Sequence, residues 1–565
     1  MAKEEETRSR QVDAAARPSR RDFLRSSAAA GVGGAAALAG RDAAAADAAA
    51  DIKWDREVDV VVIGAGASGL PAAIAARDGG ASVMLLEQHF DIGGCAIISG
   101  GTVHIGAGNR IQQEKGVKDS PDLVFADWTR PGHKAARYND RDLVRRFADE
   151  NLATFDFLNE NGVQWGELSG PQAASTVPRQ VTAVEWPIRG QLVAFDQQRN
   201  GSGIVRPLEI SARRKGVEIL LQHKMTRVVR EGHFTGPVLG VTAVQVDRWF
   251  QPTYQTLNVR ARKGVIVATG GHGGNVELRR VFDPRLTAEY QAHGEDLAPH
   301  NGDGEIAAMA IGASLWATAN QTNEAGAAIN KGRMGVKNNY IRGRFTPESP
   351  NFFRARASGQ VVHDWQNVIL VKENGKRFWD ETKENYDYHA AALAWSGDPK
   401  KLNGGGPIWA IFDADGVERE KWKTDYPYVD RAGGYFFSAA TLIELASELR
   451  RNEYQWRPMP GAALQATVER FNSFVDGGKD LDFNRPSPPH KIAKPPFYAA
   501  WATPCLHDAL TGLRTNTDGE VIDLYGKVIP GLYAVGESQG GFQMHGLARC
   551  IVFGRIAGMH AAARA

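Results

Sequence analysis

Cysteine is scarce in this chain of 565 residues. Cys95, Cys505 and Cys550 are its only cysteines, and none of them stands in a CxxC or CxxCH motif. An odd and sparse set of thiols is typical of small buried side chains rather than of a disulfide framework. The sequence therefore predicts no metal site built on cysteine and no covalently attached haem on this chain.

An excess of charge of one sign is also missing. The 67 Lys and Arg residues nearly balance the 65 Asp and Glu residues, which leaves a formal net charge of +2. So weak a field does not favour nucleic acid as a partner. The hydrophobic content of 43% is ordinary for a soluble globular protein, and the length predicts two or three domains.

Residues 1–50 contain no apolar run long enough for a membrane span. Arg20 and Arg21 precede a Phe-Leu pair, an Ala- and Gly-rich stretch over residues 26–40, and an alanine tract with A-x-A-like sites. This order resembles a cleaved twin-arginine export signal. The alternative is a low-complexity tail in which the arginine pair is incidental. We expect a periplasmic or otherwise extracytoplasmic protein without a stable membrane span.

The chain does contain a nucleotide-binding βαβ pattern. Residues 58–63 are a β-branched apolar run of strand length, and Gly64, Gly66 and Gly69 follow it. Gly64 allows a tight turn, Gly66 lets the backbone approach a pyrophosphate, and Gly69 lets the next helix pack against the strand. A second apolar strand ends at Glu87, where a carboxylate accepts hydrogen bonds from an adenosine ribose. Glycine-rich turns are common, but this ordered set predicts a dinucleotide site.

Later segments are predicted to return to the same nucleotide-binding part. The glycine-rich residues 93–102 are expected to contact the cofactor rather than to form an ordinary loop. Apolar strands are predicted at residues 263–269 and 527–537. The last helix, predicted over residues 551–563, would direct its partially positive N-terminal end at the negative charge of a reduced flavin.

Outside these motifs the sequence predicts two helices and a separate middle region. One helix is predicted over residues 140–161, and Asp303 is expected to cap a helix over 306–312. The amino-acid composition changes over residues 314–495, where Trp-, Asn- and Gly-rich loops alternate with short predicted strands. A hairpin over residues 366–378 has an Asn-Gly turn. We interpret this region as an inserted cap domain.

The motifs GAGASG, GGCAIISGG, VIVATGG, HNGDGE, NGKRFWDE and GLYAVGE, with the closing HGLARCIVFGRIAG, span nearly the whole chain after residue 55. As a set they resemble the fumarate reductase and 3-ketosteroid dehydrogenase superfamily of FAD-dependent oxidoreductases. The resemblance implies an α/β fold with a Rossmann-like FAD-binding domain over residues 55–313 and 496–565. It also implies an inserted α+β cap (substrate) domain over residues 314–495, with the active site between the two.

The resemblance further implies non-covalent FAD, because no histidine stands where the family attaches flavin covalently. No metal is expected in the site. The residues expected to bind the cofactor are Gly64, Gly66, Ser68, Gly69, Glu87, Gly94, Cys95, Ser99, Gly101, Thr269, Gly270, Asp303, Glu537, Cys550 and Ile551.

The family's chemistry moves a hydride between flavin N5 and one carbon, and a proton at the neighbouring carbon. By resemblance Arg549 holds the substrate's carboxylate or carbonyl group. The acid arginine of the fumarate reductases has no counterpart in this sequence. Tyr386, Tyr388 and Tyr498 are therefore the expected proton carriers, although each is equally well explained as a packing residue.

Histidines are a further departure from the fumarate reductases. Where those enzymes have paired histidines before Met-Gly-Gly, this chain has His507-Asp508, which argues against a dicarboxylate substrate. His104 and His545 are equally well explained as structural residues.

Three functions remain open from the sequence. The first is an exported dehydrogenase of a bulky ketone such as a 3-ketosteroid, and the missing acid arginine and haem favour it weakly. The second is a periplasmic reductase of an unsaturated carboxylate or enone that receives electrons from a separate carrier. The third is a flavoprotein electron-transfer subunit, against which the cap counts because such a module need not enclose a small-molecule substrate.

Overall fold

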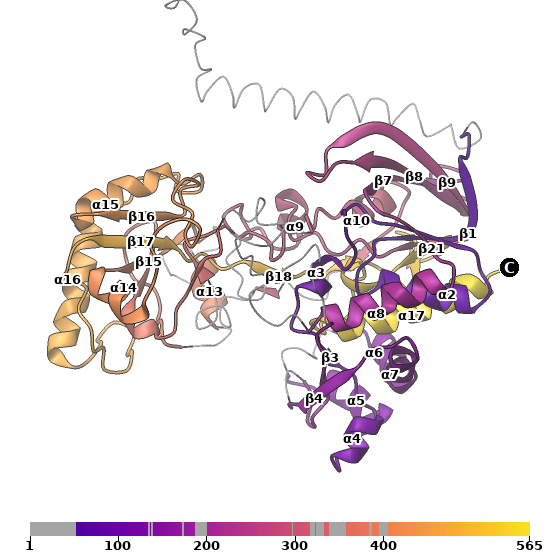
Figure 1. Cartoon of the computed structure of the whole chain (residues 1–565), viewed down its shortest axis with the longest axis horizontal. Coiled ribbons are helices and arrows are strands. Elements are labelled where there is room, and N and C mark those ends of the chain that lie inside the picture. Colours follow the sequence, from indigo (N-terminus) through magenta and orange to yellow (C-terminus); the bar gives the residue numbers. More distant parts are fainter. Residues whose placement is uncertain are drawn as a thin grey trace, which may run out of the picture.

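The computed structural model describes residues 52–133, 136, 139–171, 174–186, 200–295, 298–316, 322–323, 333–337, 357–383, 387–394 and 405–565. The predicted export signal lies outside these residues. Figure 1 shows two lobes joined by a narrower middle, with a smaller group of helices and strands beneath the right-hand lobe. We call the right-hand lobe the base lobe and the left-hand lobe the cap lobe.

The base lobe is built on an eight-stranded sheet. Its strand order is β20-β21-β9-β1-β2-β6, with β7 and β8 continuing antiparallel from β9. The members are β1 (Arg56–Ile63), β2 (Val83–Leu86), β6 (Glu218–Leu220), β7 (His223–Arg230), β8 (Val238–Val246), β9 (Pro252–Val267), β20 (Glu520–Ile522) and β21 (Val528–Ala534). The strands β1, β2, β6, β9 and β21 run parallel, so strand ends far apart in sequence meet at one edge.

Both faces of this sheet are covered, which explains the continuous apolar strand at residues 58–63. Val60 and Val62 pack into the core on one face, while Val61 and Ile63 pack into the core on the other. The helices α2 (Gly69–Asp78), α8 (Ser202–Arg214) and α17 (Leu547–Ala563) cover the first face, and α10 (Asp303–Met309) packs on the second.

Close helix packing brings the two ends of the chain together. The helices α2 and α17 lie against each other at Gly554, where an added Cβ would lie 2.2 Å from the Ser68 carbonyl oxygen. Glycine is therefore required there by close approach of two backbones. The beginning and the end of the described chain thus form one nucleotide-binding lobe.

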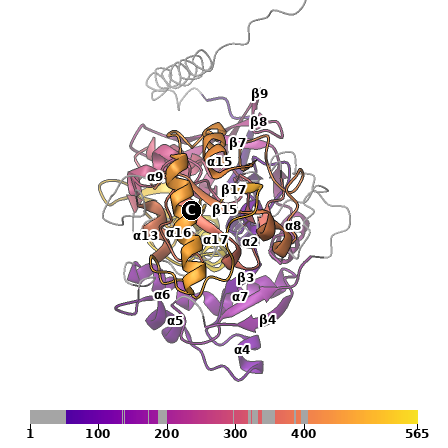
Figure 2. The same ribbon diagram turned by 90° about the vertical axis from the view of Figure 1, so that its left-hand side faces the viewer.

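The cap lobe contains a four-stranded antiparallel sheet in the order β14-β15-β17-β16. Its strands are β14 (Ile369–Lys372), β15 (Ile408–Phe412), β16 (Phe436–Ala439) and β17 (Phe497–Trp501). The helices α15 (Leu442–Glu448) and α16 (Gly461–Gly477) pack on one face, and α13 (Asp387–Leu393) and α14 (Ala414–Glu420) pack on the other. Figure 2 views the molecule from this end, with α15 and α16 in front.

Strand pairing moves the predicted domain boundaries. The strand β17 pairs with β15 and β16, so residues 497–501 belong to the cap sheet and the boundary at residue 496 is wrong. At the other end, β10 (Leu315–Trp316) pairs with β19 (Gly512–Leu513) beside the base sheet, so the cap does not begin at residue 314. Composition alone could not locate either boundary, because the strands that pair there are distant in the chain.

A smaller group of elements lies beneath the base lobe (Figure 1). It comprises the sheet β3-β5-β4 and four short helices, namely β3 (Thr102–His104), β4 (Trp165–Ser169), β5 (Gln180–Ala183), α4 (Arg110–Glu114), α5 (Pro121–Trp128), α6 (Arg141–Asp149) and α7 (Asn151–Glu160). The single helix predicted over residues 140–161 is two helices that meet at Glu150.

Two other local predictions need correction. The N-cap of α10 is Gly302 at φ 70°, and Asp303 is the first helical residue rather than the cap. The last helix begins at Leu547, four residues before the predicted Ile551. The predicted hairpin is present: the Asn-Gly turn after β14, with Gly375 at φ 73°, brings Arg377 into an antiparallel bridge with Val371, while β14 pairs along its length with β15.

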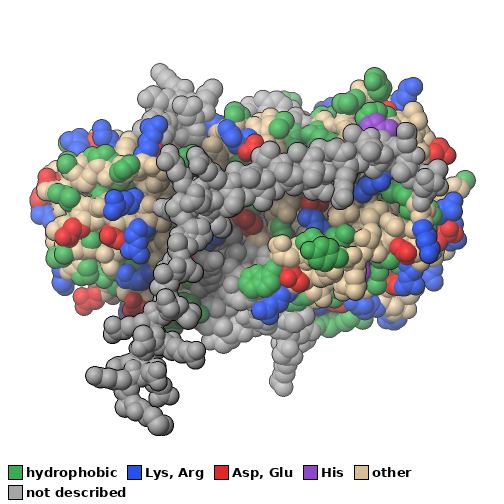
Figure 3. Space-filling model, turned by 90° about the horizontal axis from the view of Figure 1, so that it is seen from above, with side chains coloured by type: hydrophobic (Ala, Val, Ile, Leu, Met, Phe, Trp, Pro, Cys, Tyr) green, Lys and Arg blue, Asp and Glu red, His purple; other side chains and the backbone are tan. Residues whose placement is uncertain are grey.

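Lys, Arg, Asp and Glu side chains are intermixed over the described residues visible in Figure 3. Among the described residues, no helix is both long and apolar enough to cross a membrane.

Candidate active site

The turn between β1 and α2 is shaped for a phosphate group. Gly64 has φ 103°, and an added Cβ at Gly69 would lie 1.8 Å from the Gly64 carbonyl oxygen. The N-cap residue Ser68 makes no side-chain hydrogen bond to the first turn of α2. The Leu70 N–H group donates to the Gly66 carbonyl oxygen at 3.2 Å, and Pro71 has no N–H group. The Gly69 N–H group and the partial positive charge of the helix end therefore remain for an external acceptor such as a pyrophosphate.

Glu87 lies directly beyond β2, next to that turn. Its carboxylate accepts hydrogen bonds from the backbone N–H groups of Ala65 and His89, each at 2.8 Å. Burial raises the pKa of Glu87. The carboxylate is thus held rigidly where the sequence predicts the ribose acceptor.

Open space follows the path on which the sequence places the cofactor. A Cβ added at Gly94 or at Gly546 would have no atom within 4 Å, and one at Gly66 would meet only the Gly93 carbonyl oxygen at 3.9 Å. These glycines come from three separate segments of the chain. At each of them the backbone is open to close approach by a ligand, as binding of a dinucleotide requires.

Parallel strand ends bring further predicted cofactor residues together. Thr269 and Gly270 follow β9, and Glu537 follows β21, the neighbouring strand. The Ser538 hydroxyl donates to the Gly270 carbonyl oxygen at 2.8 Å and lies 3.1 Å from the Thr269 hydroxyl. Burial and the charge of Asp508 raise the pKa of Glu537.

Some predicted cofactor residues lie in other surroundings. The side chain of Asp303 forms an ion pair with Lys224 at 3.1 Å. Ser99 accepts a hydrogen bond from the Gly101 N–H group at 3.2 Å, so these two residues shape their own loop. Burial raises the pKa of the Cys550 thiol to about 12, which keeps that thiol neutral. Ile551 is the fifth residue of α17 and is fully buried.

Cys95 contacts a histidine that sequence reasoning did not single out. Its sulfur lies 2.9 Å from Nε2 of His300, a residue held at φ 50°. Burial alone lowers the pKa of His300, but the charge and hydrogen bond of the Cys95 sulfur outweigh it and raise the pKa to about 10. A cationic ring is thereby placed beside the open space at Gly94.

Arg549 lies in the first turn of α17 and is 1% exposed. Nη1 donates to the Phe542 carbonyl oxygen at 2.7 Å, and Nη2 donates to the Ala509 carbonyl oxygen at 3.2 Å. Among the described residues its buried Nε has no hydrogen-bond partner. A buried guanidinium with an unsatisfied donor favours an anionic or carbonyl ligand.

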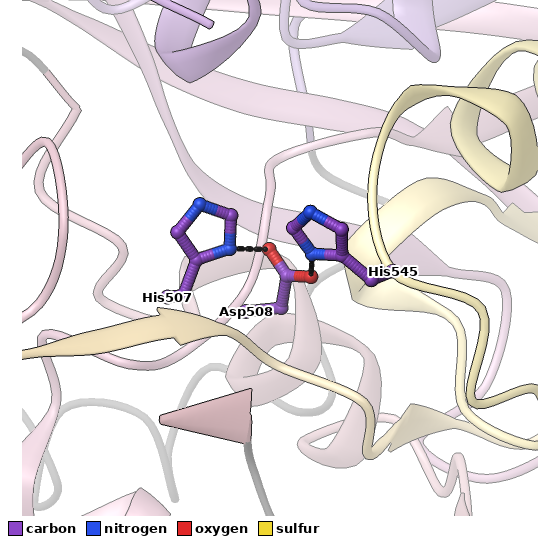
Figure 4. A group of neighbouring side chains, drawn as sticks. All are labelled: His507, Asp508 and His545. Carbon is purple, nitrogen blue, oxygen red and sulfur yellow. Dashed lines mark hydrogen bonds and ion pairs between the residues drawn. The ribbon is translucent and has the colours of Figure 1, made fainter. Parts of the chain in front are cut away.

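Two histidines share the carboxylate of Asp508, as Figure 4 shows. Nδ1 of His507 lies 2.9 Å from Asp508 Oδ1, and Nδ1 of His545 hydrogen-bonds to Oδ2. The two rings lie 4.5 Å apart between centroids, and His293 stacks on His507 at 5.1 Å. Burial alone raises the pKa of Asp508, but the charges of the two imidazoles hold it well below its ordinary value.

This cluster was only partly visible in the sequence. The His507-Asp508 pair was noticed as a departure from a family pattern, and His545 was left open as a structural residue. β18 (Leu506–Asp508) follows the cap strand β17, whereas His545 precedes α17 in the base lobe. Asp508 and His545 come into contact because the chain passes from the cap lobe back to the base lobe, and no local sequence pattern predicts such a contact.

The predicted tyrosines do not join this cluster. Tyr388 and Tyr498 lie in the hydrophobic core of the cap sheet, where Tyr498 stacks on Phe412 at 5.4 Å. Burial raises the pKa of both phenols, and Tyr388 is 1% exposed. Core packing therefore explains both residues, and a role of either one in carrying the proton stays a prediction. Tyr386 lies outside the described residues.

Two charged residues of the NGKRFWDE motif, Arg377 and Glu381, form buried ion pairs within the cap lobe. The Glu381 carboxylate accepts hydrogen bonds from Arg377 at 2.9 and 2.8 Å and from Arg485 at 2.9 Å. Arg377 also donates to Asp480 at 2.9 Å. All four side chains are buried in the cap lobe. This network organises the loop after β14 rather than a ligand site.

Comparison with known proteins supports the assignment of an FAD-binding site to this chain. The family described as "FAD binding domain" matches residues 59–550. "Fumarate reductase (cytochrome)" of Shewanella frigidimarina is 29% identical over 513 residues, which covers 89% of this chain and 77% of that protein. "Acrylate reductase flavoprotein subunit" of Shewanella woodyi is 28% identical, covering 95% of this chain and 97% of that protein.

Solved structures agree on the fold. The open conformation of a flavocytochrome c3 fumarate reductase has a TM-score of 0.63 at 25% identity, covering 92% of this chain and 80% of that chain. A 3-ketosteroid Δ1-dehydrogenase from Sterolibacterium denitrificans has a TM-score of 0.62 at 20% identity, covering 90% and 100%. The second likeness concerns the fold alone.

Proposed function

Because this chain belongs to the FAD binding domain family, we propose that it reduces a carbon–carbon double bond conjugated to a carbonyl or carboxylate group. The chain is an FAD-dependent oxidoreductase, and the two relatives described above are named as reductases. The finer assignment rests on one observation. Arg549, with an unsatisfied buried donor, lies beside the two imidazoles that share Asp508.

Each part of the site has a distinct task in such a reaction. FAD, when bound, supplies the hydride chemistry of the reaction. The N-terminus of α2 and the Glu87 carboxylate bind the dinucleotide. Arg549 binds the substrate oxygen and withdraws electron density from the conjugated bond. The histidines lie where a proton can be exchanged next to that bond.

Two observations support reduction rather than dehydrogenation. The dehydrogenase expectation was favoured by the missing acid arginine and haem, but Tyr388 and Tyr498, two of its expected proton carriers, are core residues of the cap sheet. A cationic site binds an electron-poor enone or unsaturated acid by its oxygen and favours hydride acceptance at the β-carbon. The names of the two reductase relatives agree with this direction.

Two further proposals concern the source of electrons and the cellular location of the protein. We infer a separate electron carrier, because the acrylate reductase relative of matching length is named as a flavoprotein subunit.

We also infer twin-arginine export from residues 1–50. Replacing Arg20 and Arg21 by lysine should retain the protein in the cytoplasm, and unchanged fractionation would refute export.

The function is tested with anaerobically photoreduced, FAD-loaded protein. Re-oxidation of the flavin is followed after mixing with fumarate, acrylate, urocanate or 2-cyclohexenone, and fast re-oxidation by at least one of them is expected. Bleaching of the oxidised enzyme by a saturated 3-ketosteroid would instead establish a dehydrogenase. Response to neither class, with rapid exchange with a redox protein, would establish an electron-transfer subunit.

A further inference from the structure

We propose that His545 is the proton carrier of this enzyme and that Asp508 is the residue that positions it. The proposal rests on the proposed reduction of a conjugated double bond and names a catalytic group for it. It replaces the tyrosines, which lie in the cap core.

The first argument is the arrangement of atoms around His545. Its Nδ1 hydrogen-bonds to Oδ2 of Asp508, so the opposite ring nitrogen, Nε2, points away from the carboxylate (Figure 4). The imidazole side chain is 43% exposed, whereas the Asp508 side chain is 6% exposed. A carboxylate behind an imidazole that reaches the open side is the arrangement of a general acid or base with its orienting partner.

The second argument is the connection to Arg549. The Ala509 carbonyl oxygen, one residue beyond Asp508, accepts a hydrogen bond from Nη2 of Arg549 at 3.2 Å. His545 itself lies four residues before Arg549, at the Gly546 turn that starts α17. An added Cβ at Gly546 would meet no atom within 4 Å, so the backbone of this turn is open, and the His545 side chain is itself 43% exposed. One hydrogen-bonded frame thus holds the proton carrier and the oxygen-binding guanidinium.

The groups beside the ring come from two strands. Asp508 on β18 supplies the negative charge, and it remains ionised because its pKa is held well below the ordinary value. His507, also on β18, lies 4.5 Å from His545 between ring centroids. Burial lowers the pKa of His104, on β3, to about 4, so that ring is neutral near pH 7.

The step balances in atoms and electrons. The β-carbon of the conjugated bond receives a hydride, which carries both electrons, from the reduced cofactor. The Nε2–H bond of His545 breaks, and its proton forms the new C–H bond at the α-carbon. The imidazolium becomes a neutral imidazole, and solvent returns the proton through the exposed side of the ring. The external carrier restores the two electrons.

The test uses FAD-loaded, photoreduced protein and two kinds of oxidant. An acceptor from the panel above needs both hydride and proton, whereas ferricyanide takes electrons one at a time and needs no proton on carbon. His545→Gln should slow re-oxidation by the organic acceptor ~100-fold or more and leave the ferricyanide rate unchanged. His233→Gln, at an exposed histidine of the β7–β8 turn, is the matched control and should change neither rate.

Two further readouts separate a chemical role from a structural one. Added imidazole should restore part of the activity of His545→Ala. Asp508→Asn should slow the organic acceptor about tenfold or more, because an amide can donate to Nδ1 and favour the wrong tautomer.

Each outcome decides the question. Equal rates for wild type and His545→Gln with an accepted substrate would overturn the proposal and leave the reductase function standing. If wild type accepts no member of the panel, the reductase function fails and the proton carrier falls with it. His507, Asp508 and His545 also have the donor atoms of a metal site. Loss of activity on dialysis against a chelator, with recovery on adding Zn²⁺, would assign the cluster to a metal instead.

Discussion

Glu381→Gln should destabilise the cap lobe severely although it changes one atom and almost no volume. The Glu381 carboxylate accepts hydrogen bonds from Arg377, from Arg485 and from the Leu370 N–H group at 3.0 Å. The side chains of Glu381 and Arg485 are 0% exposed, and that of Arg377 is 3% exposed. The substitution leaves the buried guanidinium of Arg377 with Asp480 as its carboxylate partner and removes the carboxylate that faces the buried guanidinium of Arg485.

The expected magnitude follows from that imbalance. Removing one partner of a buried ion pair destabilises a protein by about 3–5 kcal/mol, since an uncompensated charge stays buried. Glu448→Gln is the matched control, because Glu448 pairs with Arg451 at 2.6 Å with both side chains largely exposed, at 44% and 61%. Such an exposed pair contributes about 0–1 kcal/mol.

Urea unfolding measures the difference with two probes. Tryptophan fluorescence reports the cap through Trp409 and Trp501, which are fully buried in its sheet, and it also reports the base through the buried Trp128. Flavin release reports the base lobe alone, so a tryptophan change without flavin release belongs to the cap. The tryptophan midpoint of Glu381→Gln should fall by about 1 M or more, and the control should fall by a few tenths at most. Equal midpoints for the two variants would refute the view that this motif carries a structural charge network.

The remaining predictions concern the cofactor path and the site. Gly69→Ala should abolish FAD binding, seen as loss of the visible flavin absorbance, because its Cβ would lie 1.8 Å from the Gly64 carbonyl oxygen. Arg549→Ala should lower turnover ~100-fold or more while flavin content stays normal, since its charge acts on the substrate. The stability that His300 contributes is fully present below its ordinary pKa of 6.5 and is lost as pH rises through about 10. Cys95→Ser should therefore flatten the decline of thermal stability between those pH values.

Each of these has a control. Gly477→Ala, in α16, introduces a Cβ with no atom within 4 Å and should keep full flavin content. Arg549→Lys keeps the charge but loses the planar fork, so turnover between that of wild type and Arg549→Ala is expected. An unchanged pH dependence in Cys95→Ser would contradict the pairing of the sulfur with the imidazole, and normal turnover in Arg549→Ala would remove it from the site.

Most of the nucleotide-binding fold was predictable because its signals are local. The strand at residues 58–63, the glycines after it and the helix α2 lie within one short segment, and backbone geometry alone requires that order. The Glu87 position follows from the same unit and lies beside the turn as expected. The boundaries of the cap were less accurate, because β17 is assigned by its pairing with β15 and β16 and not by its own composition.

The amino-acid sequence by itself determined the class of cofactor, the α/β architecture and the importance of the last helix. Those features depend on short-range steric rules that any chain with these glycines and apolar runs must obey. Only the tertiary structure decided which polar groups meet. Asp508 reaches His545 because the chain crosses from the cap sheet back to the base lobe, while Tyr388 and Tyr498 are withdrawn into the cap core. Contacts between residues far apart in sequence depend on how lobes pack, and no local pattern records that packing.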